Sequence, residues 1–214
     1  AVLLGAGVPA AGQEGWTALG ADREAAMAFA SAYAGFLGKA RTEIQTVAQA
    51  LALARQKGAL PLPEAGPPRP GALARPGAVF LANNRDRACA IVVWGVAGPS
   101  AGLRIVACHD DAPRIDLKAR PVYEREGFAC LQTVYHGGIR SYQWANVPLA
   151  LVGRCAFPSG EVRDIALGLG PDDPVFVIPA PAPHEDKPFR ERKMPDVLEG
   201  EELDPVAAHE GGAD

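Results

Sequence analysis

The sequence predicts an α/β fold in which two helices precede a mostly β-stranded part. Two helical periods of apolar residues occur before residue 60, and strand-like apolar runs begin at Ala78 with no further long helical period. Of the 214 residues, 48% are hydrophobic and 21% are charged, which is typical of a globular chain with a core. The length fits one full domain, or one domain with part of a second.

The first helix is expected over Ala21–Ala40, because apolar residues recur there at near-helical spacing. This apolar stripe consists of Met27, Ala30, Tyr33, Phe36 and Leu37. Thr42 is expected to cap a second helix, because Gln45 follows three residues later as in a capping box. Gly58 is well placed to end that helix in the left-handed conformation.

The stretch 59–77 is expected to be a linker or an extended loop. Six prolines lie between Pro61 and Pro76, and this density excludes a regular helix or a central strand. Strands are expected on either side of a hairpin turn at "NRDR", namely "AVFLAN" and "ACAIVVW", and then at "LRIVAC". Further strand-like runs are "FACLQTVY", "VPLALVGRCAF", "VRDIALGL" and "PVFVIP".

The charge balance argues against nucleic acid and membranes as partners. The formal net charge is −4, and no apolar run approaches the roughly 20 residues of a membrane span. The opening "AVLLGAGVPAAG" lacks a basic start, so a trimmed N-terminus is favoured over a signal-peptide remnant. None of the four cysteines forms a CxxC pair, which favours buried thiols in a reducing cytoplasm over disulfides or a zinc knuckle.

An apolar run ends at His109, Asp110 and Asp111. Residues i and i+2 of an extended segment point the same way, so His109 and Asp111 can act together. His109 could ligate a metal while Asp111 accepts its other ring N–H and fixes the tautomer, or both could ligate. The alternative is an ordinary turn in which one of the two aspartates caps backbone N–H groups.

The block "TVYHGGIRSYQW" carries a second set of candidates. Gly137 and Gly138 suit either a substrate loop or a plain tight turn. His136 is expected to be a surface or half-buried histidine, with polar lining of a site as the alternative. Tyr142 and Trp144 alternate with polar residues, as packing residues on a strand do. There is no GxSxG, P-loop or GxGxxG motif to support nucleophile or nucleotide chemistry.

Several blocks in order carry a resemblance to one family. "HDDAPRIDLK" is similar to the pattern His-x-Asp-Ser-Pro-Arg-x-Asp-x-Lys, and "YHGGIRSYQW" to Tyr-x-Gly-Gly-Ile-x-x-Tyr-Gln-Trp. "DDPVF" and the Pro183-His184 pair follow at the expected places, and "YAGFLGKARTE" looks like the N-terminal helix junction. Over roughly residues 16–203 the chain resembles the aspartyl-aminopeptidase-like zinc metallopeptidases, in particular their prokaryotic branch.

The resemblance implies a zinc aminopeptidase-type α/β domain into which a β-rich dimerisation domain is inserted. Residues 1–150 would then be the N-terminal part of the α/β domain, and 151–195 part of the dimerisation domain. Residues 196–214 contain seven acidic residues and no Lys or Arg, and a solvated or disordered tail is expected there. The family also implies a homo-oligomer built from dimers, such as a dodecamer.

The implied activity is release of N-terminal amino acids from peptides by a water activated between two divalent metal ions. The ions would be zinc, with cobalt or manganese as alternatives. His109 matches a metal ligand, and Asp111 matches the carboxylate that orients this ligand. His184 matches a histidine that contacts the substrate carbonyl in the neighbouring subunit's active site.

The sequence departs from the family pattern in three ways. Ala112 replaces the usual serine, and Glu185-Asp186 replaces an apolar pair after His184. The family's other metal ligands and its general-base glutamate come after the inserted domain, and 185–214 has no cluster that could supply them. Two classes of function therefore remain: the N-terminal portion of a metalloaminopeptidase, inactive alone, or a non-catalytic dimerisation module or truncated pseudoenzyme. A different metallohydrolase is disfavoured by the Gly-Gly-Ile and Tyr-Gln-Trp block.

Overall fold

The structure is a computed structural model that describes residues 22–62, 76–97, 99–180, 182, 184, 191–194 and 197–209. It divides into two compact units, Ala1–Asp110 and Asp111–Asp214, each described by itself. The predicted domain boundary near residue 150 refers to the inserted dimerisation domain and stays a prediction. The apolar N-terminal stretch and most of the proline-rich segment lie outside the described residues.

The first unit begins with the two predicted helices, α2 (Arg23–Leu37) and α3 (Glu43–Gln56). Thr42 is the N-cap of α3, and its side chain accepts a hydrogen bond from the Gln45 backbone N–H at 3.3 Å. Gly58 has the predicted left-handed conformation, with φ of 84°. Helix α2 has no buried side chain, so its apolar stripe is not part of a core among the described residues.

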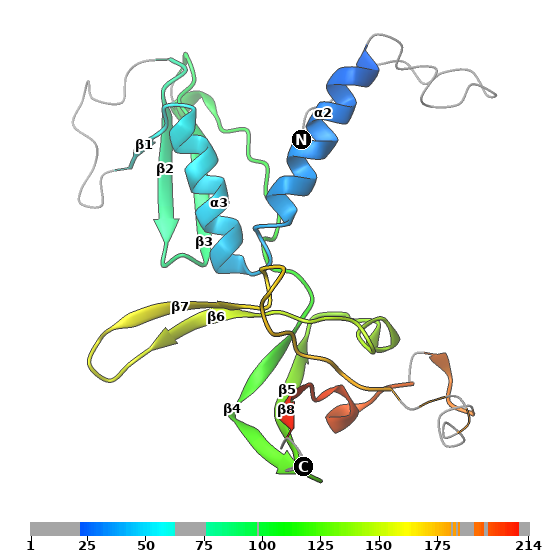
Figure 1. Cartoon of the computed structure of the whole chain (residues 1–214). Helices are drawn as coiled ribbons and strands as arrows, with labels where there is room; N and C mark the ends of the chain where they lie inside the picture. Colours follow the sequence, from blue (N-terminus) through cyan, green and yellow to red (C-terminus); the bar gives the residue numbers. More distant parts are fainter. Residues whose placement is uncertain are drawn as a thin grey trace, which may run out of the picture. The chain divides into compact units, whose positions relative to one another are not determined.

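A small mixed sheet packs against α3 (Figure 1). Its order is β1 (Leu60–Pro61), β2 (Val79–Asn84) and β3 (Ala88–Val93), with β1 parallel and β3 antiparallel to β2. The core between helix and sheet consists of Val47, Leu51, Ala59 and Leu81. Pro61 is tolerated because β1 is a short edge strand. Helices together with a mixed sheet confirm the predicted α/β class.

The turn between β2 and β3 is the hairpin predicted at "NRDR". Arg85 and Asp86 both have positive φ, 55° and 58°, which suits the tight turn of a twisted hairpin. The Asn83 side-chain oxygen accepts a hydrogen bond from the Asp86 N–H at 3.0 Å and so fixes the turn locally.

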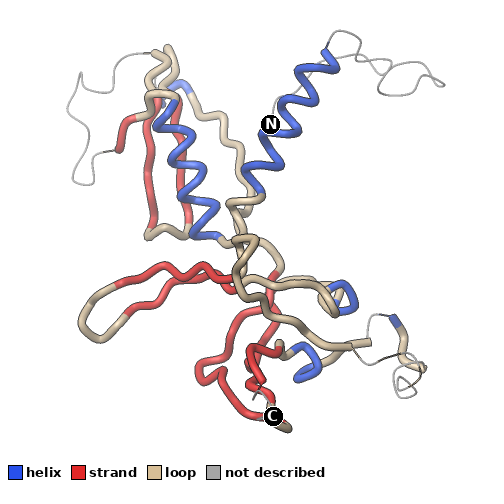
Figure 2. Tube along the Cα trace, viewed as in Figure 1, coloured by secondary structure: helices blue, strands red, loops and turns tan. Residues whose placement is uncertain are grey.

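The predicted strand at "LRIVAC" is wrong for this chain. After the 3₁₀ turn η2 (Pro99–Ala101), residues 102–113 have no regular secondary structure, and Figure 2 draws the stretch that follows as loop. Leu103, Ile105 and Val106 are all exposed. The physical reason is that a strand needs a neighbour for its backbone groups, and no described segment pairs with this one.

The second unit contains a three-stranded antiparallel sheet in the order β4 (Arg114–Arg125), β5 (Phe128–His136) and β8 (Val206–His209). Strand β4 is the longest strand, yet no strand was predicted there. Its polar residues are frequent, and Pro121 interrupts the pattern. The pairing with β5 is irregular between Leu117 and Val122, and this bulge accommodates the proline.

Two further segments complete the strand-rich part. Strands β6 (Leu151–Ala156) and β7 (Val162–Leu167) form a separate antiparallel pair whose side chains are mostly exposed.

Tyr142 and Trp144 do not lie on a strand as predicted, because Ser141–Gln143 form the 3₁₀ helix η3, which ends at Trp144. Trp144 nevertheless has a packing role, since it contacts the buried core of this unit.

The disordered tail predicted from residue 196 is a second correction. Residues 197–209 contain the 3₁₀ helix η5 (Gly200–Leu203) and strand β8. Leu198 and Leu203 are buried together with Ile178, which is fully buried. The acidic composition of the segment gave no indication that Leu198, Leu203 and Asp204 are buried. Residues 210–214 lie outside the described part of the chain.

All four cysteines are free thiols, but only Cys130 is buried. Cys89 is half-buried, and Cys108 and Cys155 are exposed, so the prediction of buried packing holds only in part. Among the helices that the structure describes, none has the length and apolar character needed to cross a membrane.

Candidate functional site

Asp111 and His136 form a side-chain pair in the second unit. His136 Nε2 lies 2.8 Å from Asp111 Oδ2, and both side chains are a little over 40% exposed. A carboxylate at this distance fixes the orientation and tautomer of an imidazole. The sequence prediction had connected Asp111 with His109, and it missed His136 as a partner.

The fold brings this pair together through the first residues of β4 and the last residue of β5. Arg114, the first residue of β4, lies opposite His136 in the strand register, so Asp111 just before β4 lies near the end of β5. Gly137 follows with φ of 72°, and a Cβ added there would lie 3.6 Å from the Pro113 Cα. The glycine therefore turns the chain closely past Pro113. The signal in the sequence was a histidine directly before a Gly-Gly turn.

His109 lies at the end of the first unit, in the open segment after η2, and is exposed. His184 is also exposed. Most of its sequence neighbours, including Pro183, lie outside the described residues. The structure thus gives the position of each of the three predicted residues, and it places Asp111 beside a histidine of its own unit.

The described residues do not form a complete metal site. Within the described ranges, no group of three or more His, Cys, Asp or Glu side chains is placed to hold a metal ion. A zinc site requires three or four protein ligands. The described residues therefore do not fit a complete zinc centre, and any such centre needs ligands from elsewhere.

A different polar cluster lies in the interior of the second unit. Asp204 is only 6% exposed, and its carboxylate accepts hydrogen bonds from the Thr133 N–H (2.8 Å), the Thr133 hydroxyl (3.1 Å) and the Tyr123 hydroxyl (2.9 Å). These bonds connect β4 and β5 to the residue that follows η5. Asp204 stabilises the fold above all through the Thr133 N–H, which would otherwise be buried without an acceptor, whereas the Thr133 hydroxyl also donates to the Leu203 carbonyl at 3.1 Å.

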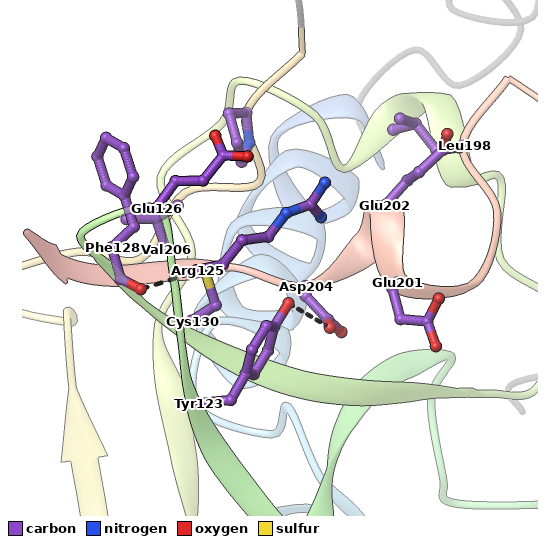
Figure 3. Close-up of a pocket in the computed structure, with 11 residues that line it drawn as sticks. Tyr123, Arg125, Glu126, Phe128, Cys130, Leu198, Glu201, Glu202, Asp204 and Val206 are labelled. Carbon is purple, nitrogen blue, oxygen red and sulfur yellow. Dashed lines mark hydrogen bonds between the residues drawn. The ribbon is translucent and has the colours of Figure 1, made fainter.

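Figure 3 shows the Tyr123 phenol pointing to Asp204 at the edge of a pocket of about 290 Å³. The described lining residues are Tyr123, Arg125, Glu126, Phe128, Cys130, Pro179, Leu198, Glu201, Glu202, Asp204 and Val206. Glu202 also forms an ion pair with Arg192, and this hydrogen-bonded partner lowers the pKa of the Glu202 carboxyl. None of the three predicted site residues is among the described lining residues.

Burial and the hydrogen bond to Asp204 raise the pKa of Tyr123 to about 12, from an ordinary value of 10.0. Below pH 10 the phenol is neutral in both the folded and the unfolded state, and its stabilising contribution is complete. Between pH 10 and 12 the unfolded phenol ionises first, so this contribution is expected to disappear over that range. Thermal unfolding should therefore show a steeper alkaline loss of stability in the parent chain than in Tyr123→Phe. Equal alkaline losses in the two proteins would contradict the assignment.

Comparison with known proteins places these features in one family. The family model described as "Aminopeptidase I zinc metalloprotease (M18)" matches residues 36–211. The "Probable M18 family aminopeptidase 1" of Borrelia garinii subsp. bavariensis is 34% identical over 176 residues, which is 82% of this chain and 37% of that protein. The chain thus spans little more than a third of this relative.

Solved structures agree. The crystal structure of the M18 aminopeptidase from Thermotoga maritima has 34% identity and a TM-score of 0.75, covering 87% of this chain and 40% of that one. The S. cerevisiae mApe1 dodecamer, with 19% identity and a TM-score of 0.59, covers 73% of this chain and 36% of that one, and it supports the fold alone. The chain belongs to the M18 family of aminopeptidase I zinc metalloproteases.

Proposed function

We propose that this chain is the N-terminal portion of a metalloaminopeptidase that releases N-terminal amino acids from peptides. The observation that carries the proposal is the family match over residues 36–211, which includes the block from His109 to Lys118. Because the chain spans only 37% of a relative's length, the activity is proposed for a complete assembly and not for these residues alone.

In such an assembly, two divalent ions would supply Lewis-acid chemistry, holding the attacking water and polarising the scissile carbonyl. We assign His109 as one metal ligand and Asp111 as the carboxylate that orients it. The 2.8 Å pair with His136 supports this role, because it holds Asp111 in place beside the end of β5. Zinc is the proposed metal, with cobalt or manganese as alternatives.

His184 is proposed to contact the substrate carbonyl in a neighbouring subunit. Its exposed position is compatible with a role outside its own unit. We propose a homo-oligomer built from dimers, supported by the exposed β6–β7 pair, because a two-stranded ribbon is only marginally stable by itself. The four free thiols suit a reducing compartment, which supports a cytoplasmic location.

The second candidate is a non-catalytic dimerisation or interaction module. It is favoured by one observation, which is that the described residues hold no cluster of three metal-ligating side chains. Under this proposal the exposed β6–β7 pair would be retained for assembly, while the chain would bind no metal.

A chimera separates the two proposals. Residues 36–211 would replace the matched part of the Thermotoga maritima enzyme, and zinc content and peptide hydrolysis would be measured against the parent enzyme. The chimera is expected to hold zinc and to release N-terminal residues, whereas the 214-residue chain, dialysed against a weak chelator, is expected to hold almost none. A folded chimera without zinc and without activity would favour the interaction module.

His184→Ala in this chimera is expected to lower turnover by about 100- to 1,000-fold, because one contact to the developing oxyanion is lost. Zinc content, measured by elemental analysis, should not change. Loss of zinc together with activity would make His184 a ligand and would contradict its proposed substrate role.

A further inference from the structure

The pocket in the second unit contains none of the residues to which the proposed function assigns a role. Its volume is about 290 Å³, and its described lining includes residues of β4, β5, β8 and the turn η5 that precedes β8. This volume lies at the lower end of the range for small-molecule sites, roughly 300–1,000 Å³. The pocket therefore fits a ligand of about amino-acid size.

Four carboxylates are among the described lining residues, and two of them already have protein partners. Asp204 accepts hydrogen bonds from Thr133 and Tyr123. Glu202 forms an ion pair with Arg192. A ligand could take up either carboxylate only at the loss of a contact that the fold already has.

The other two carboxylates, those of Glu126 and Glu201, are exposed and form no ion pair with any residue that the structure describes. The same is true of the Arg125 guanidinium, which lines the same pocket. In the view of Figure 3, the Arg125 guanidinium lies between Glu126 on one side and Glu201 on the other. A guanidinium binds a carboxylate through two parallel hydrogen bonds, and a carboxylate attracts an ammonium group. The pocket can therefore bind a ligand that carries both charges.

The rest of the described lining is apolar and consists of Phe128, Cys130, Pro179, Leu198 and Val206. Cys130 and Leu198 are buried, so they belong to the deeper part of the pocket wall. Apolar surface beside a few charged groups is the usual composition of small-molecule sites, in which the charged groups orient the ligand. A ligand for this pocket is therefore expected to have an apolar part in addition to its charges.

We propose that this pocket binds a free α-amino acid with an apolar side chain. The ligand carboxylate pairs with Arg125, its ammonium group pairs with Glu126 and Glu201, and its side chain packs on Phe128. A simple cation is disfavoured by the guanidinium, and a simple anion by the two carboxylates. Binding does not depend on the proposed function. Only one consequence rests on that function, which is that the ligand belongs to the class of molecule that the reaction releases.

The test is a titration of the intact 214-residue chain with L-leucine, followed by NMR in the presence of a chelator. Saturable binding with a Kd of about 1 mM is expected, because so small a ligand makes few contacts. The backbone amide signals of Phe128 and Val206 should shift, whereas that of His184, which does not line the pocket, should not.

Two analogues of leucine separate the contributions of its charges. Leucinamide lacks the carboxylate, and 4-methylpentanoate lacks the ammonium group. Each should bind at least about 10-fold more weakly than leucine, because one hydrogen-bonded charge pair is lost. Equal binding of leucinamide would show a site for cations, and equal binding of 4-methylpentanoate would show a site for anions. Either result overturns the amino-acid assignment.

Arg125→Gln is expected to weaken leucine binding about 10- to 100-fold without weakening the binding of leucinamide. Glu201→Gln should likewise weaken the binding of leucine and not that of 4-methylpentanoate. The matched control is Arg120→Gln, which changes an exposed arginine of β4 that is not among the described lining residues. It should bind leucine as the parent does, and circular dichroism should show that all three variants fold, because the substituted side chains are exposed.

The inference is overturned if the folded parent chain shows no saturable leucine binding at about ten times the expected Kd. Equal leucine binding by Arg125→Gln and Arg120→Gln overturns it as well. These results are distinguishable from a failure of the proposed function. Leucine binding by the 214-residue chain together with an inactive chimera keeps the amino-acid site and rejects the catalytic proposal. An active chimera together with no leucine binding keeps the catalytic proposal and rejects the amino-acid site.

Discussion

His109→Ala is expected to abolish peptide hydrolysis by the chimera that carries residues 36–211, reducing kcat/KM by at least about 1,000-fold. The reason is that the site loses an imidazole ligand of the metals. Bound metals lower the free energy of the charged transition state by several kcal/mol. Folding should be almost unchanged, because His109 is exposed in a segment without regular structure. Zinc content and peptide hydrolysis would be measured on the same preparation.

The matched control is His209→Ala, which removes an exposed histidine from β8 and is expected to retain both zinc and activity. Asp111→Asn should give an intermediate result, with metal affinity lowered about 10- to 100-fold, because the carboxylate orients the ligand without being the ligand. A fully active His109→Ala chimera would show that the ligand assignment is wrong.

Asp204→Ala is expected to destabilise the second unit by about 3–5 kcal/mol. The substitution leaves the Thr133 N–H and the Tyr123 hydroxyl without their acceptor, whereas the Thr133 hydroxyl keeps the Leu203 carbonyl at 3.1 Å. Each buried donor without a partner costs about 1–3 kcal/mol, although water entering the space would recover part of this. The measurement is hydrogen exchange of the β5 amides, above all that of Thr133.

Asp172→Ala is the control for this variant, because Asp172 is an exposed aspartate of the same unit. Its β5 amides should exchange at the parent rate. If Asp204→Ala also left the exchange of the Thr133 amide unchanged, the three hydrogen bonds would not hold β5 to the segment after η5.

Caps and turns were predictable from the sequence because they depend on residues that are close together in the chain. The N-cap at Thr42, the left-handed Gly58 and the "NRDR" hairpin each depend on residues within four positions of one another, and all three are confirmed. The strand at 103–108 was not confirmed, because its formation depends on a partner that the described residues do not provide. Strand β4 was missed for a related reason, since its polar side chains are acceptable only because β5 pairs with its backbone.

The candidate site also has features that the sequence predicted and features that only the structure shows. Family resemblance in the sequence identified His109, Asp111 and His184, and the family itself is confirmed. Their proposed roles remain predictions for a complete assembly. The partner of Asp111 could not be read from the sequence, because 25 residues separate it from His136 and only the β4–β5 register brings them within 2.8 Å.

By itself the sequence determined the family and the order of helices before strands, because these depend on residue type and on spacing along the chain. Tertiary structure alone decided that Asp204 is a buried acceptor and not part of a solvated tail. It also decided that Asp111 meets His136. The physical reason is that burial and hydrogen bonding depend on which distant segments meet, and composition averaged over a segment does not contain this information.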